Sequence, residues 1–179
     1  MRNFFIMPIQ FQYFPKSERM PDHLGSLIEV FNKKDGVISS NGNQLRSDEV
    51  LSILAPEMER IGYKVEKGKS SKLKIRIPVL YGRNNTIEKA FEVDGFNKET
   101  GTVVEVEAGR GVMNHQFLKD LFEAIVMQEV NYLVIAIRNI YEYSNTQSED
   151  FEKVVEFIEV LYTSNRISLP LKGILIVGY

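Results

Sequence analysis

The chain has 179 residues, a formal net charge of -2 and 44% hydrophobic residues, which suits a single folded domain with a sizeable core. It contains no Cys, which excludes disulfide scaffolds, thiolate metal sites and cysteine nucleophiles. Two His residues leave any metal to be held mainly by carboxylates, which favours Mg²⁺, Mn²⁺ or Ca²⁺. No apolar run approaches the roughly 18 residues of a membrane span, so the sequence predicts a soluble, cytoplasmic protein with no membrane partner.

The first third of the chain predicts an aromatic segment followed by two helices. Residues 1–21 are aromatic and interrupted by Pro, which favours packing against a core or a dimer partner. Apolar residues recur at helical spacing over 24–31, and the turn-rich segment 35–44 predicts a loop. A second helix is expected from Ser47, with Pro56 kinking or splitting it.

After residue 62 the hydrophobic period changes from helical to two. The segment KLKIRIPV (72–79) alternates basic and apolar residues, which predicts a strand with one solvent-exposed, basic face and one buried face. AFEVDGF (90–96) and TVVEVEA (102–108), joined by NKETG, predict a hairpin. The segment from Lys64 to Arg83 holds seven Lys or Arg and one acid. It predicts either a surface for the DNA backbone or an edge strand that charge protects from aggregation.

The second half alternates helices with buried strands. Helices are expected over 112–128, with Asn114 as N-cap, and over 148–162. The continuous apolar runs YLVIAI (132–137) and GILIVG (173–178) predict strands buried on both faces of a parallel sheet. This order of elements predicts an α/β fold, with a mixed β-sheet flanked by helices on both sides.

Four acids of the predicted hairpin share one face. A tight turn within NKETG places Asp94 opposite Glu105 and Glu92 opposite Glu107. Like charges that face each other across a sheet destabilise it, so divalent cations, neighbouring Lys or Arg, or bulk water must offset them. Because the second strand leads directly into a glycine-containing turn and a helix, we interpret the acids as a metal site at the carboxyl end of a strand.

The spacing of these acids resembles a known nuclease motif. Asp94, about ten residues, and then Glu105-Val106-Glu107 on a strand followed by a helix is similar to the motif of the PD-(D/E)xK nuclease superfamily. The resemblance implies a restriction-endonuclease-like fold over residues 47–179, and leaves residues 1–46 as an N-terminal extension that carries the first helix. Val93 stands where Pro is common. Glu107 stands where Lys is usual. This departure resembles a subgroup of type II restriction enzymes whose motif ends in Glu.

The resemblance also implies roles for the acids. Asp94 and Glu105 are expected to hold Mg²⁺, which Mn²⁺ can replace. Glu107 is expected to orient or deprotonate the attacking water, or to complete the ligand set, so all three acids are candidate catalytic residues. Glu57 or Glu59 of the preceding helix is a candidate extra ligand.

Four further residues are candidates for contact with the substrate or for local structure. Arg110 directly follows the motif strand and is a candidate phosphate contact. Lys119, one turn into the next helix, either supplies the cation that the motif strand lacks or is solvated. His115 either touches the substrate or packs and caps the helix. Arg138 ends the buried strand at the same edge of the sheet.

Two classes of function follow. The first is a metal-dependent DNA endonuclease, of the type II restriction kind or a repair or mobile-element enzyme, that acts as a homodimer because two copies cut two strands. The second is a non-catalytic domain of the same fold that binds nucleic acid or protein. The sequence has no glycine-rich phosphate loop and no nucleophile-elbow sequence, which argues against nucleotide hydrolysis and serine hydrolase chemistry.

Overall fold

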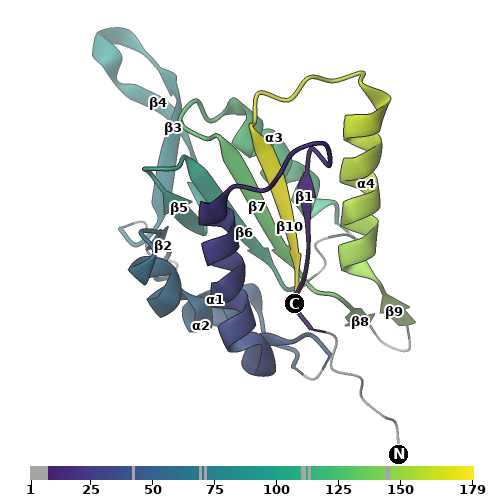
Figure 1. Ribbon diagram of the computed structural model, residues 1–179. Helices are drawn as coiled ribbons and strands as arrows, with labels where there is room; N and C mark the ends of the chain where they lie inside the picture. Colours follow the sequence, from purple (N-terminus) through teal and green to yellow (C-terminus); the bar gives the residue numbers. More distant parts are fainter. Residues whose placement is uncertain are drawn as a thin grey trace, which may run out of the picture.

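A six-stranded mixed sheet forms the centre of the computed structural model, which describes residues 8–41, 43–68, 70, 72–109, 112, 114–143 and 146–179 (Figure 1). Across the sheet the strands are β1 (Gln10–Phe14), β10 (Gly173–Gly178), β7 (Tyr132–Ile137), β6 (Thr102–Glu107), β5 (Gly95–Asn97) and β2 (Lys64–Val65). Strands β10, β7 and β6 are parallel to one another, whereas β1, β5 and β2 each run antiparallel to their neighbour.

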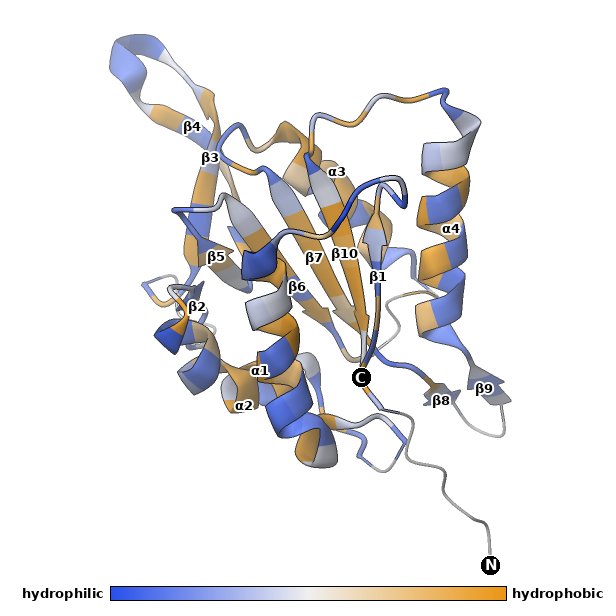
Figure 2. Ribbon diagram, viewed as in Figure 1, coloured by the Kyte–Doolittle hydropathy of each residue, from blue (hydrophilic) through white to orange (hydrophobic). Residues whose placement is uncertain are grey.

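Helices cover both faces of this sheet. Helices α1 (Asp22–Ile38) and α2 (Ser47–Arg60) pack on one face, in a core that includes Val104 and Val106 of β6. Helices α3 (Gln116–Val126) and α4 (Asp150–Ser164) pack on the other face, in a core that includes Val103. Figure 2 shows the apolar strands enclosed between these layers. The predicted mixed sheet with helices on both sides is therefore confirmed.

The two central strands match the sequence prediction in type and bounds. The four middle residues of each strand, 133–136 in β7 and 174–177 in β10, have no exposed surface. Both strands are parallel and covered on both faces, which is why their sequences are continuously apolar rather than alternating. Together they form the rigid base beside which β6 and its acids lie.

The hairpin around the candidate site has the predicted register where it forms. Gly95 lies opposite Val104, and Asn97 lies opposite Thr102. The turn that joins the two strands ends at Gly101, whose φ of 65° lies in the left-handed region. The pairing of β5 with β6 is therefore set by a turn that glycine adopts at little cost.

The predicted position of Glu92 is wrong. The chain changes direction at Asp94, and the preceding residues form β4 (Ile87–Val93), which pairs with β3 (Ile75–Tyr81) in a separate two-stranded sheet. Glu92 consequently lies opposite Arg76 and not opposite Glu107. The opposite charges across β3 and β4 favour this pairing over one that would face two carboxylates.

Some helix boundaries differ from the predictions. Helix α1 continues to Ile38, so part of the predicted loop is helical, and α2 passes through Pro56 as one helix. Proline removes only one backbone hydrogen bond, and the buried apolar face of α2 retains its packing on the sheet. Helix α3 begins at Gln116, and its N-cap is His115 in a left-handed conformation rather than Asn114.

Several small elements were not predicted from the sequence. Strand β1 lies at the edge of the main sheet, with Tyr13 and Phe14 buried as the packing hypothesis for 1–21 requires, although residues 1–7 lie outside the described part. Strands β8 (Tyr141–Tyr143) and β9 (Thr146–Ser148) form a short separate hairpin. Within the part of the chain that the structure describes, no helix is long and apolar enough to cross a membrane.

Replacing Gly101 by Ala is expected to destabilise the fold by about 2 kcal/mol or more, because the left-handed conformation is sterically unfavourable for a residue with a Cβ atom. A Cβ atom there would also lie 2.7 Å from the backbone carbonyl oxygen of Glu129 and 2.4 Å from the side-chain Nδ2 atom of Asn131. Urea denaturation of the two proteins measures the change. Equal midpoints would show that this turn does not hold the β5–β6 register.

Candidate active site

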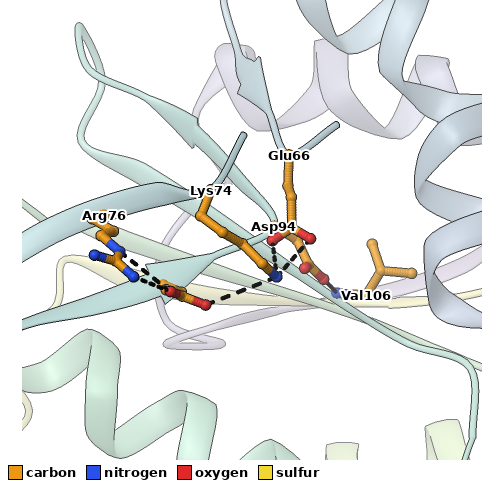
Figure 3. A network of polar contacts seen from close by, with 6 residues as sticks. Glu66, Lys74, Arg76, Asp94 and Val106 are labelled. Atoms are coloured by element: carbon orange, nitrogen blue, oxygen red, sulfur yellow. Dashed lines mark hydrogen bonds and ion pairs between the residues drawn. The ribbon is translucent and has the colours of Figure 1, made fainter. Parts of the chain in front are cut away.

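Three of the predicted acids meet at one end of β6. Glu105 and Glu107 alternate with Val104 and Val106, whose side chains pack toward α1 and α2, so the two acids point to the face that α3 covers. Asp94 lies across from them, and its Oδ2 atom accepts a hydrogen bond of 2.8 Å from the backbone N–H of Val106 (Figure 3). The structure thus brings together Asp94, Glu105 and Glu107.

A fourth carboxyl group, that of Asp120 on α3, completes the cluster and was missed by the sequence analysis. Its residue is 4% exposed, and it lies within hydrogen-bond reach of Glu107. The Oδ2 atom of Asp120 has no donor among the described residues unless the Glu107 carboxyl carries a proton. The sequence does hold one indication of this role. Asp120 lies on the buried face of α3, and the other buried residues of that helix are apolar: Phe117, Leu121 and Ala124.

Burial raises the pKa of every carboxyl group in this cluster. It raises the pKa of Asp94 to about 6, despite the Val106 N–H that favours the charged form, and the pKa of Asp120 to about 6. Burial and the charges of Asp120 and Asp94 raise the pKa of Glu107 to about 8. Burial and the charge of Asp94 likewise raise the pKa of Glu105 well above its usual range. The cluster therefore resists accumulating negative charge unless a cation accompanies it.

The donor set suits a hard divalent cation that keeps part of its hydration shell. Among the described residues, no group of three or more His, Asp or Glu side chains is placed to hold a metal ion by itself. Mg²⁺ commonly takes one or two carboxylates and completes its octahedron with water and substrate phosphates. The carboxylates of Asp94 and Glu105 fit that requirement, since two such groups leave the remaining positions to water and phosphate.

A lysine on the opposite side of Asp94 supplies positive charge to the site. The Nζ atom of Lys74, just before β3, lies 2.7 Å from both carboxylate oxygens of Glu66 and 3.8 Å from Oε2 of Glu92. Glu66 is tied to the same place because its N–H donates a hydrogen bond of 2.8 Å to the carbonyl oxygen of Asp94. Figure 3 shows the side chains of Lys74, Glu66 and Asp94 directed toward one another.

The Lys74 ammonium remains charged in this setting. Its hydrogen bonds to Glu66 raise its pKa, as do the charges of Glu66, Glu92 and Asp94. Arg76 continues the network outward, since its guanidinium donates a hydrogen bond of 2.9 Å to Glu92. Lys74 was assigned from the sequence only to a basic segment, and the bend of the chain at Asp94 brings it to the acids.

Of the residues predicted to contact the substrate, Lys119 lies at the cluster, Arg110 is not described, and His115 lies at the start of α3. Lys119 is exposed on α3 at the rim of the cluster, with its Nζ atom 3.7 Å from Asp120 and 3.3 Å from Glu123. Arg110 lies outside the described residues. His115 is exposed at the start of α3 and makes no side-chain capping bond.

Three other candidates do not join the cluster. Arg138 is buried and donates a hydrogen bond of 2.6 Å to the carbonyl oxygen of Leu45, so it supports the fold. Glu57 pairs with Lys33 and Arg60, and Glu59 pairs with Lys67 at 2.7 Å. Helix α2 packs on the sheet face opposite to the acids, which is why neither of its glutamates reaches them.

The fold is also found in a known structure. No protein-family model matches the sequence, and no curated protein matches it. The solved structure of the free restriction endonuclease BglII superposes with a TM-score of 0.51 and 15% sequence identity, covering 96% of this chain and 79% of the other. The strand order, the helices on both faces and this similarity agree, and the chain has a restriction-endonuclease-like fold.

Proposed function

We propose that this protein is a Mg²⁺-dependent endonuclease that hydrolyses phosphodiester bonds in DNA. The observation that carries the proposal is the gathering of four carboxyl groups with raised pKa values at the end of β6, on a restriction-endonuclease-like fold. Such a cluster is costly without a cation. The arrangement is what an enzyme needs to bring a metal ion to a phosphate.

Each residue of the site has a role in this proposal. Asp94 and Glu105 hold the metal ion, as in the PD-(D/E)xK pattern with Val93 and Glu107 at its variant positions. The ion, when bound, neutralises charge on the phosphate and lowers the pKa of a coordinated water. Glu107 accepts a proton from the attacking water, for which a raised pKa is favourable. Asp120 orients Glu107.

The fold and the chemistry support a proposal for the substrate class and the assembly. We take the substrate to be duplex DNA, cut in the manner of a type II restriction enzyme. The enzyme acts in the cytoplasm as a homodimer, because two copies of one site cut both strands most simply. A repair or mobile-element nuclease would use the same chemistry on another DNA substrate.

Nicking of supercoiled plasmid tests the proposal directly. The wild-type protein is expected to nick DNA with Mg²⁺ or Mn²⁺ and to stop when EDTA is added. The Asp94→Asn variant is expected to be inactive, while Asp48→Asn, which changes an exposed acid of α2, retains activity. Wild-type protein that never nicks DNA would instead support the non-catalytic binding domain.

Replacing Lys74 by Met is expected to slow cleavage by about 10- to 100-fold, because groups that orient metal-binding acids commonly contribute this much. The ammonium that holds Glu66 and faces Asp94 is lost, and the pKa of Asp94 rises further. The control is Lys72→Met, which removes an exposed charge from the same segment. Single-turnover rates distinguish the two, and equal rates for both variants would exclude this role for Lys74.

A further inference from the structure

Strands β3 and β4 form an arm that projects beyond the main sheet. Figure 1 shows this two-stranded element extending away from the helices at the upper left. Its base is anchored, because Ile77 and Val93 are each 2% exposed. Its outer part is solvated, and its turn is made tight by Asn84 and Asn85, whose φ values of 57° and 60° are left-handed. The arm is thus an extension that is packed against the core at its base and exposed in its outer part.

The arm is basic although the protein is acidic. Residues 75–93 of the arm contain three Lys or Arg and two Glu, a net charge of +1, and Lys72 and Lys74 directly before β3 bring the charge of 72–93 to +3, whereas the whole chain carries -2. The remainder therefore carries -5. Lys72, Arg76, Arg83 and Lys89 are all exposed. Lys on a strand also protects a sheet edge from pairing, and positive charge gathered on one projecting element attracts an anionic partner as well.

A cleft lies between the arm and α3, beside the carboxylate cluster. It has a volume of about 700 Å³, and its charged lining consists of three bases, Arg76, Lys89 and Lys119, and three acids, Glu88, Glu92 and Glu123. Lys119 also contacts Asp120 of the cluster. On the arm side, Glu92 lines the cleft and lies 3.8 Å from Lys74. A polyanion whose phosphate reaches the acids would therefore pass along the inner face of the arm.

We propose that the β3–β4 arm is a binding surface for the phosphate backbone of duplex DNA, with α3 as the opposite wall. Arg83 and Lys89 contact phosphates at a distance from the one that is cleaved, and Arg76 contacts those nearer to the acids. The choice of DNA rests on the proposed function. The contribution of the arm to binding does not depend on cleavage, so the two can be tested separately.

Binding of a fluorescein-labelled duplex of roughly 25 base pairs, in EDTA and between about 50 and 200 mM salt, tests the arm. The double variant Arg83→Glu, Lys89→Glu is expected to bind at least about 10-fold more weakly, and its salt dependence is expected to fall by about two counterions. The matched control is Lys33→Glu, Lys153→Glu, which makes the same charge change on exposed residues of α1 and α4. Both pairs are exposed, so the unfolding midpoints should not differ.

The outcomes separate this inference from the nuclease proposal. Arm-dependent binding by a wild-type protein that never nicks plasmid would support the arm and refute the nuclease. Active wild-type protein whose arm variant binds like the control would refute the arm alone. Absence of DNA binding by the wild type would also overturn the inference. The inference would also be overturned if the arm variant changed the oligomeric state seen in sedimentation and left DNA binding unchanged. The exposed Leu80, Tyr81 and Ile87 of the arm would then belong to an interface between copies of the chain.

Discussion

Replacing Glu105 by Gln is expected to reduce the rate of DNA cleavage by about 10³-fold, which corresponds to ~4 kcal/mol of lost transition-state stabilisation. Burial and the charges of Asp94 and Asp120 raise the pKa of Glu105, so it lies near both acids and shares their candidate site for a cation. The amide keeps the shape of the side chain but cannot carry the negative charge. The metal is then held mainly by Asp94 and by water.

The matched control for Glu105→Gln is Glu99→Gln, which makes the same chemical change in the exposed turn between β5 and β6. Single-turnover cleavage at saturating Mg²⁺ measures the rates, and circular dichroism confirms that both variants are folded. A Glu105→Gln variant that cleaves DNA within a few-fold of the wild-type rate would show that Glu105 is not part of the site.

The stability of the metal-free protein is expected to fall as the pH rises from about 5 to 8. The pKa values of Asp94, Asp120 and Glu107 in the folded state, about 6, 6 and 8, exceed the ordinary carboxyl values of 3.8 and 4.5. Between these limits the folded state binds more protons than the unfolded state, so the free energy of unfolding decreases with pH. Below the ordinary values the contribution is fully present.

The Glu107→Gln variant is expected to be more stable than the wild type at pH 8 in EDTA, on the order of 2 kcal/mol. The amide has no charge to bury beside Asp120, so the cost of ionising residue 107 disappears. Urea denaturation of both proteins at pH 5 and pH 8 gives the free energies, and the difference should shrink at pH 5. A wild-type protein that gains stability from pH 5 to pH 8 in EDTA would contradict the proposed strain in the cluster.

Much of the fold could be predicted from the sequence because its central strands are unambiguous. The apolar runs of β7 and β10 are too continuous for a half-exposed strand, and they are followed or preceded by helical periodicity. The edge strand β1 was missed because Pro and aromatic residues obscure its period. The bend at Asp94 was also missed, since nothing local distinguishes a strand that changes partner from one that continues.

The grouping of acids in the candidate site could be predicted as far as alternation within strands determines it. Glu105 and Glu107 had to share a face, and the turn set Asp94 beside them. Asp120 and Glu66 come from elements whose placement depends on packing, so spacing along the chain could not connect them with the hairpin. The sequence predicts Glu92 as the fourth acid of the cluster, whereas the structure places Asp120 there, because tertiary packing decides which acid lies beside Glu107.

Calorimetric titration of Mn²⁺ into the wild-type protein and into Asp94→Asn tests most directly whether the carboxylate cluster binds a metal ion through Asp94. We expect saturable binding by the wild type, accompanied by proton release because the acids have raised pKa values, and loss of this binding in the variant. Absence of Mn²⁺ binding by the wild type, with duplex DNA present as well as without it, would contradict the metal-dependent mechanism.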